Sequence, residues 1–187
     1  LIASGFTAGA ALPNSPGILR FPDVDQTRIV FVYAGDLWMV PKAGGTAVRL
    51  TNVPGPKSYP RFSPDGQTIG FTGTYNGIYT IPAAGGQVNR ITHHGGTTAL
   101  CSWTPDGRLL FMSDAFSHLF NADGQARVRQ LFTVAANGGL PQKLPVPYGA
   151  NGVISEDGEW LAYTPYAEGL TEKRKRYYGG FAPDVWL

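Results

Sequence analysis

The sequence predicts an all-β fold, a β-propeller of four-stranded antiparallel blades, incomplete, with about three and a half blades present. Three observations predict it. The 187 residues include 25 glycines and 15 prolines, a composition that suits short strands joined by tight turns. A set of landmarks recurs at intervals of forty-odd residues. Apolar residues alternate with a period of two within the expected strands, which is typical of half-buried strands.

Three landmarks define the repeat, and they keep the same order along the chain. A turn motif ending in Asp-Gly lies at Ser63–Gly66, Thr104–Gly107 and Ser155–Gly158. A glycine pair recurs at Gly44-Gly45, Gly85-Gly86 and Gly138-Gly139. An aromatic residue holds one common position as Trp38, Tyr79, Phe132 and Trp186. Independent landmarks that move together indicate a structural repeat.

Each repeat is expected to form four strands. In the second copy they are Ser58–Phe62, Gln67–Thr72, Gly77–Pro82 and Val88–Thr92. The Asp-Gly pair between the first two strands tolerates the positive φ of a tight hairpin turn. One such sheet cannot bury both of its faces, whereas radial stacking of several sheets can, and this favours a propeller.

We assign the blades to residues 18–52, 58–92, 99–146 and 151–187, the last one partial, with its third strand at Pro183–Leu187. Residues 1–17 are expected to be a signal-peptide remnant or a disordered tail, because Ala8-Gly9-Ala10 has the form of a cleavage site before Ala11. This predicts export to a periplasmic or extracellular location, and the alternative is a cytoplasmic protein.

Charge and motifs exclude several function classes. A formal net charge of +2 is too small for a nucleic-acid-binding surface. No segment reaches the roughly 18 apolar residues of a membrane span. Neither a metal-ligand spacing nor a cofactor motif is present, so we expect no metal and no cofactor. Cys101 lies in an apolar strand and is expected to be a buried, unreactive thiol.

The second repeat resembles the propeller repeat shared by TolB and the tricorn peptidases, in the stretches Tyr59–Gly66, Ile69–Phe71, Gly77–Tyr79 and Arg90–Thr92. Two further regions resemble tricorn proteases alone. The opening is similar to the start of their first propeller, at Leu19–Asp23, Ile29–Tyr33 and Gly35–Trp38. Lys175–Gly180 resembles a Lys-Arg-Tyr-Arg-Gly-Gly motif of the family, although Tyr178 replaces its second basic residue.

The resemblance runs from about residue 18 to the end, and it implies a serine peptidase that degrades short peptides. In that family two propellers precede a PDZ module and a catalytic region, and the propellers are thought to filter access. The chain would then be an access and assembly region with no catalytic residue of its own. Its partners would be peptide substrates and other domains or subunits of the same protein. The rival hypotheses are a non-enzymatic TolB-like propeller that binds a protein partner and the propeller of a prolyl-oligopeptidase-type enzyme.

The candidate site residues lie in turns and loops. Asp65, Asp106 and Asp157 are expected to serve the hairpin turns rather than catalysis. In an antiparallel meander, the turns after the first and third strands lie on one face of the disc, and the loops after the second and fourth strands lie on the other. The tight turns all fall on the first face and the long loops on the second, where recognition usually resides. That second face carries His93, His94 and His118, which we expect to be solvated rather than metal ligands.

The binding candidate is the basic run Lys173, Arg174, Lys175 and Arg176 with the adjacent Tyr177, on the same face. Three interpretations remain open for it: a solvated loop, a contact with a neighbouring domain or subunit, and attraction of the acidic ends of peptides.

Overall fold

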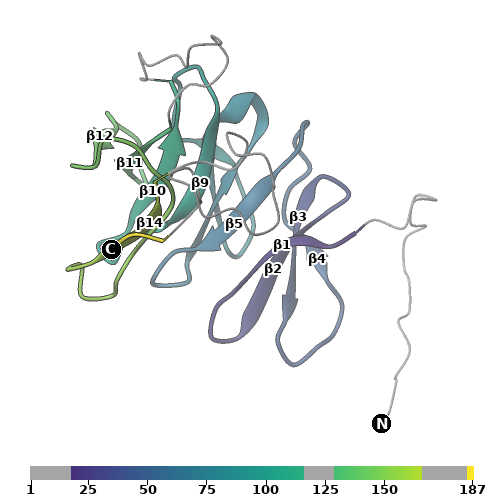
Figure 1. Cartoon of the computed structure of the whole chain (residues 1–187). Coiled ribbons are helices and arrows are strands. Elements are labelled where there is room, and N and C mark those ends of the chain that lie inside the picture. The colour runs from purple at the N-terminus through teal and green to yellow at the C-terminus, as the bar shows by residue number, and fades with distance from the viewer. Residues whose placement is uncertain (1–17, 116–128, 166–184) are drawn as a thin grey trace, which may run out of the picture.

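The computed structural model describes residues 18–115, 129–165 and 185–187, and they form four antiparallel sheets (Figure 1). Three sheets have four strands and the fourth has two. Blade one holds β1 (Arg20–Val24), β2 (Arg28–Tyr33), β3 (Asp36–Pro41) and β4 (Val48–Arg49). Blade two holds β5 (Ser58–Phe62), β6 (Thr68–Thr72), β7 (Ile78–Pro82) and β8 (Asn89–Arg90). Blade three holds β9 (Thr98–Trp103), β10 (Arg108–Ser113), β11 (Gln130–Ala135) and β12 (Gln142–Lys143), and blade four begins with β13 (Ala150–Ile154) and β14 (Leu161–Thr164).

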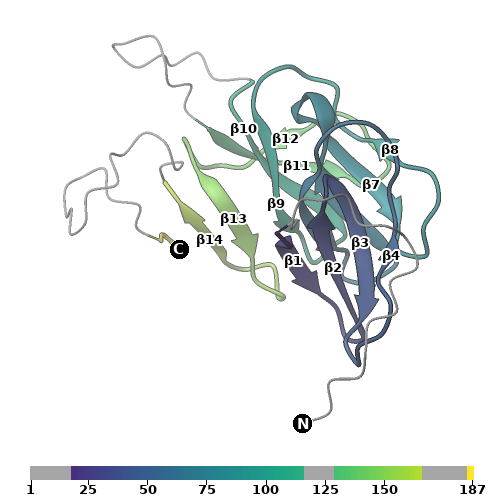
Figure 2. The ribbon, with the colours of Figure 1, turned by 90° about the vertical axis from the view of Figure 1, so that its right-hand side faces the viewer.

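Within each blade the strands follow one another in a simple meander. The first strands of successive blades are neighbours, because β1 packs against β5, β5 against β9 and β9 against β13. The blades therefore fan out from a shared inner row of first strands, and they do not close into a ring (Figures 1 and 2). The predicted all-β, incomplete propeller is confirmed.

The aromatic landmarks occupy one register position, as the repeat predicts. The third-strand aromatic pairs with an aromatic residue of the second strand in every blade: Phe31 with Trp38, Phe71 with Tyr79, Phe111 with Phe132, and Tyr163 with Trp186. The last pair exchanges two backbone hydrogen bonds of 2.8 and 3.0 Å. Trp186 thus forms an isolated bridge beside β14, at the position that the third strand takes in the other blades.

The apolar core lies between the blades. Blades one and two bury Val30, Leu37, Ile69 and Phe71 against each other, and blades two and three bury Ile78, Leu100, Leu109 and Phe111. A smaller cluster of Leu110, Leu131 and Tyr163 joins blades three and four. Each fully buried side chain of this kind contributes about 1.5–3 kcal/mol relative to exposure. Radial stacking thus supplies the burial that a single sheet lacks.

The hairpin turns follow their sequence signals. Gly66 and Gly107 have φ values of +68° and +79°, so the predicted positive-φ positions are confirmed. The Asp65 carboxylate accepts hydrogen bonds of 2.6 Å from Ser63 Oγ and 3.0 Å from the Gln67 N–H, which is the expected turn role. Asp106 and Asp157 accept from Thr104 and Ser155 in the same way.

Two features differ from the expected elements. The fourth strands are only two residues long in the first three blades. In blades one and two, Thr51 Oγ1 then accepts the Leu37 N–H at 3.0 Å and Thr92 Oγ1 accepts the Ile78 N–H at 2.9 Å. A short 3₁₀ helix, Thr74–Asn76, fills the turn between β6 and β7.

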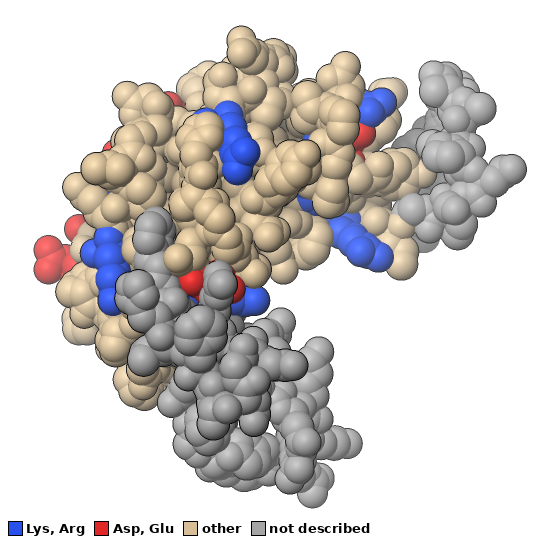
Figure 3. Space-filling view, turned by 90° about the horizontal axis from the view of Figure 1, so that it is seen from above, with Lys and Arg blue, Asp and Glu red and all other residues tan. Residues whose placement is uncertain are grey.

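No helix in the described ranges is long and apolar enough to cross a membrane. The face in Figure 3 is mostly uncharged, with Lys and Arg in separate places.

Candidate functional site

A cleft of about 540 Å³ opens on the tight-turn face, at the inner ends of the first three blades. Its volume lies within the range of roughly 300–1,000 Å³ that is usual for small-molecule sites. The lining comes from the hairpin turns of blades one and two and from the end of β9, in residues 23–28, 61–66 and 102–103.

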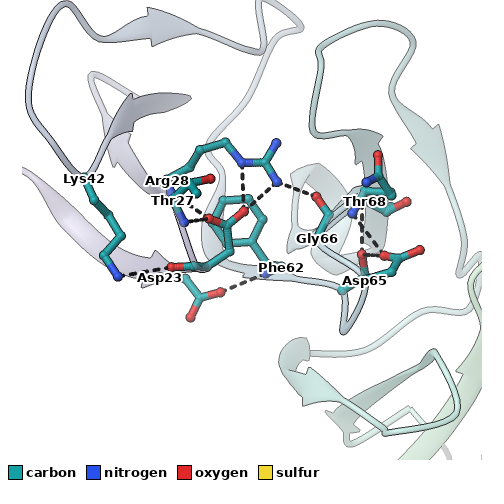
Figure 4. Close-up of polar contacts among 11 residues, drawn as sticks. Asp23, Thr27, Arg28, Lys42, Phe62, Asp65, Gly66 and Thr68 are labelled. Carbon is teal, nitrogen blue, oxygen red and sulfur yellow. Dashed lines mark hydrogen bonds and ion pairs between the residues drawn. The ribbon is translucent and has the colours of Figure 1, made fainter.

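One ion pair in the cleft is closed. Arg28 donates to Asp25 Oδ2 from Nε at 2.8 Å and from Nη2 at 2.5 Å (Figure 4). Its Nη2 also donates to the Gly66 carbonyl of blade two at 2.6 Å, and its guanidinium lies 5.2 Å from the centre of the Phe62 ring. Burial by itself would raise the pKa of Asp25, but the hydrogen bonds and charge of Arg28 outweigh it and lower that pKa. This pair ties the two blades together.

A second pair in the cleft is open. Asp23 Oδ1 and Arg61 Nη1 are 3.9 Å apart, which is too far for a hydrogen bond. Asp23 Oδ2 accepts the Phe62 N–H at 2.8 Å, and Arg61 donates from Nε to the Cys101 carbonyl at 3.2 Å and from Nη1 to the Pro60 carbonyl at 3.0 Å. Burial raises the pKa of Asp23, and the Phe62 N–H and Arg61 offset this only in part.

The repeat explains why these side chains meet. In each of the first three blades, a backbone N–H closes the hairpin between the first two strands. The residues two positions before that N–H, in β1, β5 and β9, are Asp23, Arg61 and Ser102. They face equivalent residues of the second strands, namely Val30, Gly70 and Leu110. The cleft is thus a polar row formed by one register position on three adjacent inner strands. The sequence prediction missed it, although the repeat alignment places the three residues in equivalent positions.

The serine hydroxyls that line the cleft are already engaged in hydrogen bonds. Ser63 Oγ donates to the Asp65 carboxylate of its own turn, and Ser102 Oγ donates to the Gly152 carbonyl at 3.1 Å. Elsewhere, Ser113 Oγ lies 3.3 Å from His94 Nε2, but Ser113 is fully buried and out of reach of a substrate. No group of three or more potential metal ligands occurs among the described residues.

The sequence-predicted binding candidates Lys173, Arg174, Lys175, Arg176 and Tyr177 lie outside the described residues, as do His118 and residues 1–17. His93 is exposed, as expected, but the expectation for His94 is wrong. Its ring stacks on Phe111 with centroids 5.8 Å apart, and partial burial lowers its pKa. Cys101 is half-buried rather than fully buried, and burial raises the pKa of its thiol to about 11, which agrees with the expected low reactivity.

The comparisons with known proteins agree with this architecture. The family model described as the Tricorn protease N-terminal beta propeller domain matches residues 16–187. The protein called Tricorn protease homolog 1 of Streptomyces coelicolor is 36% identical over 69 residues, which are 37% of this chain and 6% of that protein. The chain therefore spans only a small part of the length of this curated relative.

Solved structures show the same fold. The crystal structure of the tricorn protease aligns with 80% of this chain and 15% of its own, at 24% identity and a TM-score of 0.65. TolB from Acinetobacter baumannii aligns with 82% of this chain and 39% of its own, at 25% identity and a TM-score of 0.65. Because the family model covers all of the described blades, the chain belongs to the tricorn protease N-terminal β-propeller family.

Proposed function

We propose that this chain is the substrate access and assembly region of a tricorn-like serine peptidase that degrades peptides. The observation that carries the proposal is the family match over residues 16–187. Among the described residues, the Thr98 and Ser113 hydroxyls each lie 3.3 Å from His94 Nε2, and both of these side chains are buried. The catalytic residues would then lie elsewhere in the full-length protein.

The division of the two faces supports the access role. The short hairpin turns lie on one face, whereas the connections between blades lie on the other, where loops are free to recognise a partner. On sequence, the basic run Lys173–Arg176 with Tyr177 falls on that second face. Its four positive charges would attract the acidic or free carboxyl ends of peptides into the passage. Other domains or subunits of the same protein would complete the enclosure.

Export is the proposed location, since residues 1–12 are small and apolar with a cleavage-like Ala8-Gly9-Ala10. The alternative is a cytoplasmic enzyme. Cell fractionation of the native host separates the two, because an exported protein is released with the periplasmic or extracellular fraction.

The test of the proposed function is hydrolysis of short peptides by the purified full-length protein. We expect turnover that a serine-directed inhibitor abolishes. The similarity to TolB at 25% identity supports one alternative, a propeller that binds a protein partner without catalysis. Absence of hydrolysis over a broad peptide library, together with stoichiometric capture of a folded protein, would favour that alternative.

A further inference from the structure

The open pair in the tight-turn cleft, Asp23 and Arg61, is built differently from the closed pair beside it. In the closed pair, Asp25 and Arg28 bond to each other in a fork. In the open pair, backbone groups hold each side chain separately, and the two charged groups stay 3.9 Å apart at their closest atoms. The two side chains thus attract each other across 3.9 Å without a hydrogen bond between them, and backbone groups fix each one in place.

Both charged groups are partly exposed in the cleft. The hydrogen bonds of the pair to described residues use Asp23 Oδ2 and Arg61 Nε and Nη1, and the Val24 N–H also contributes to the surroundings of the Asp23 carboxylate. The Asp23 and Arg61 side chains are 26% and 32% exposed, so a ligand in the cleft can reach both. A site whose polar groups are already oriented loses little conformational entropy when it binds.

The charges of the pair select the ligand. A simple cation would be attracted by Asp23 and repelled by Arg61, and a simple anion would meet the reverse situation. A ligand that carries an ammonium and a carboxylate on the same carbon matches both groups at once. The partly buried Asp23 carboxylate, whose pKa burial raises, also gains from a cation that replaces lost water contacts.

We infer that this cleft binds a free α-amino acid as its zwitterion, with the ammonium group against Asp23 Oδ1 and the carboxylate against the Arg61 guanidinium. The Ser102 hydroxyl lies at the next equivalent position of the inner row. Val24, which is 55% exposed, and Trp103 line the same cleft and offer apolar surface to an aliphatic side chain. This site is independent of the proposed peptidase activity.

Calorimetric titration of the full-length protein tests the inference with three probes. L-leucine carries both charges, N-acetyl-L-leucine lacks the ammonium, and L-leucinamide lacks the carboxylate. We expect L-leucine to bind at least about tenfold more tightly than either blocked compound, since each loses a charge-assisted hydrogen bond. Equal binding of all three, or no measurable binding of L-leucine, would overturn the inference without recourse to any variant.

Two variants assign the charges. Asp23→Asn should reduce the preference for L-leucine over N-acetyl-L-leucine, and Arg61→Gln should reduce the preference for L-leucine over L-leucinamide. Lys143→Gln is the control and should leave both preferences unchanged, because Lys143 is exposed on β12 and does not line the cleft. Each preference is a ratio within one variant, so a general loss of folded protein does not alter it. Ratios unchanged in both variants would contradict the assignment.

Discussion

Lys57, in the connection between blades one and two, donates to the carboxylate of Asp36 at the start of β3, with Nζ 2.9 Å from Oδ1. The Lys57 side chain is 3% exposed, and its ammonium also bonds to the carbonyls of Val53 and Gly55. Asp36 in turn accepts from Thr51 Oγ1 at 2.7 Å. The buried Lys57 ammonium therefore holds the connection between blades one and two against blade one.

Replacing Lys57 with Met should destabilise the fold by on the order of 3 kcal/mol, because it removes the buried cation from Asp36 and leaves two carbonyls without their donor. The Asp36 carboxylate then keeps only the more exposed Arg49 as an ion-pair partner, at 2.5 Å from Oδ2. Chemical denaturation of the full-length protein measures this loss of stability from the unfolding transition of the propeller. Lys42→Met is the control, since Lys42 is exposed and makes only a 3.5 Å contact with the Asp25 carbonyl. Equal stability of the two variants would show that the buried pair does not hold the connection.

The same pair predicts a pH dependence. Burial alone would raise the pKa of Asp36, but hydrogen bonds from Lys57 and Thr51 and the charge of Lys57 outweigh it and lower the pKa. A carboxyl group whose pKa is lower in the folded state stabilises the fold above its unfolded pKa of about 4 and loses that effect as the pH falls through its folded value. The wild type should therefore lose stability below about pH 4 more steeply than Lys57→Met. Parallel acid unfolding curves would contradict this.

The first hairpins give a second stability test. Gly66→Val and Gly107→Val should each destabilise by about 1–3 kcal/mol, since both positions have positive φ. A Cβ at Gly66 would also lie 3.2 Å from Arg28 Nη2, whereas one at Gly107 meets nothing within 4 Å. Gly66→Val should therefore cost more. Gly95→Ala is the control, because that site is open and not at positive φ. An unchanged melting temperature for Gly66→Val would refute the placement of this hairpin.

The features predicted well from the sequence are those that depend on local chemistry. An Asp-Gly pair demands a tight turn, so the positive-φ positions of Gly66 and Gly107 follow from the sequence alone. The aromatic position of Tyr79 and Trp186 recurs because the third-strand residue at this position pairs with an aromatic residue of the second strand in each blade. The turn motif and the aromatic position both depend on contacts within a single repeat.

The features that escaped prediction depend on contacts between repeats. Asp23 and Arg61 meet only because adjacent inner strands align at one register position. Phe21 and Tyr59 adopt positive φ values of 51° and 52° at bulges in β1 and β5, a conformation that aromatic residues rarely take. The packing of His94 against Phe111 likewise needs the fold of the connecting segment. Local propensity carries no information on any of these.

The basic run outside the described residues gives a functional prediction. Under the proposed function, neutralising Lys173, Arg174, Lys175 and Arg176 together in the full-length protein should lower kcat/KM for acidic peptides and flatten its dependence on salt. The reason is that exposed charges act over about 8–10 Å at ordinary ionic strength. A neutral, end-blocked peptide is the control substrate, and its hydrolysis should barely change. Equal losses on both substrates would indicate a structural or assembly role instead.

The central claim, that this propeller limits access to a peptidase, is tested most directly by the size dependence of hydrolysis. The full-length protein is given one cleavable sequence, first as a short peptide and then embedded in a long, permanently unfolded polypeptide. We expect the short peptide to be cleaved with a much higher kcat/KM per bond, because the long chain has to thread through the enclosure. Equal kcat/KM per bond for the two substrates would contradict the account.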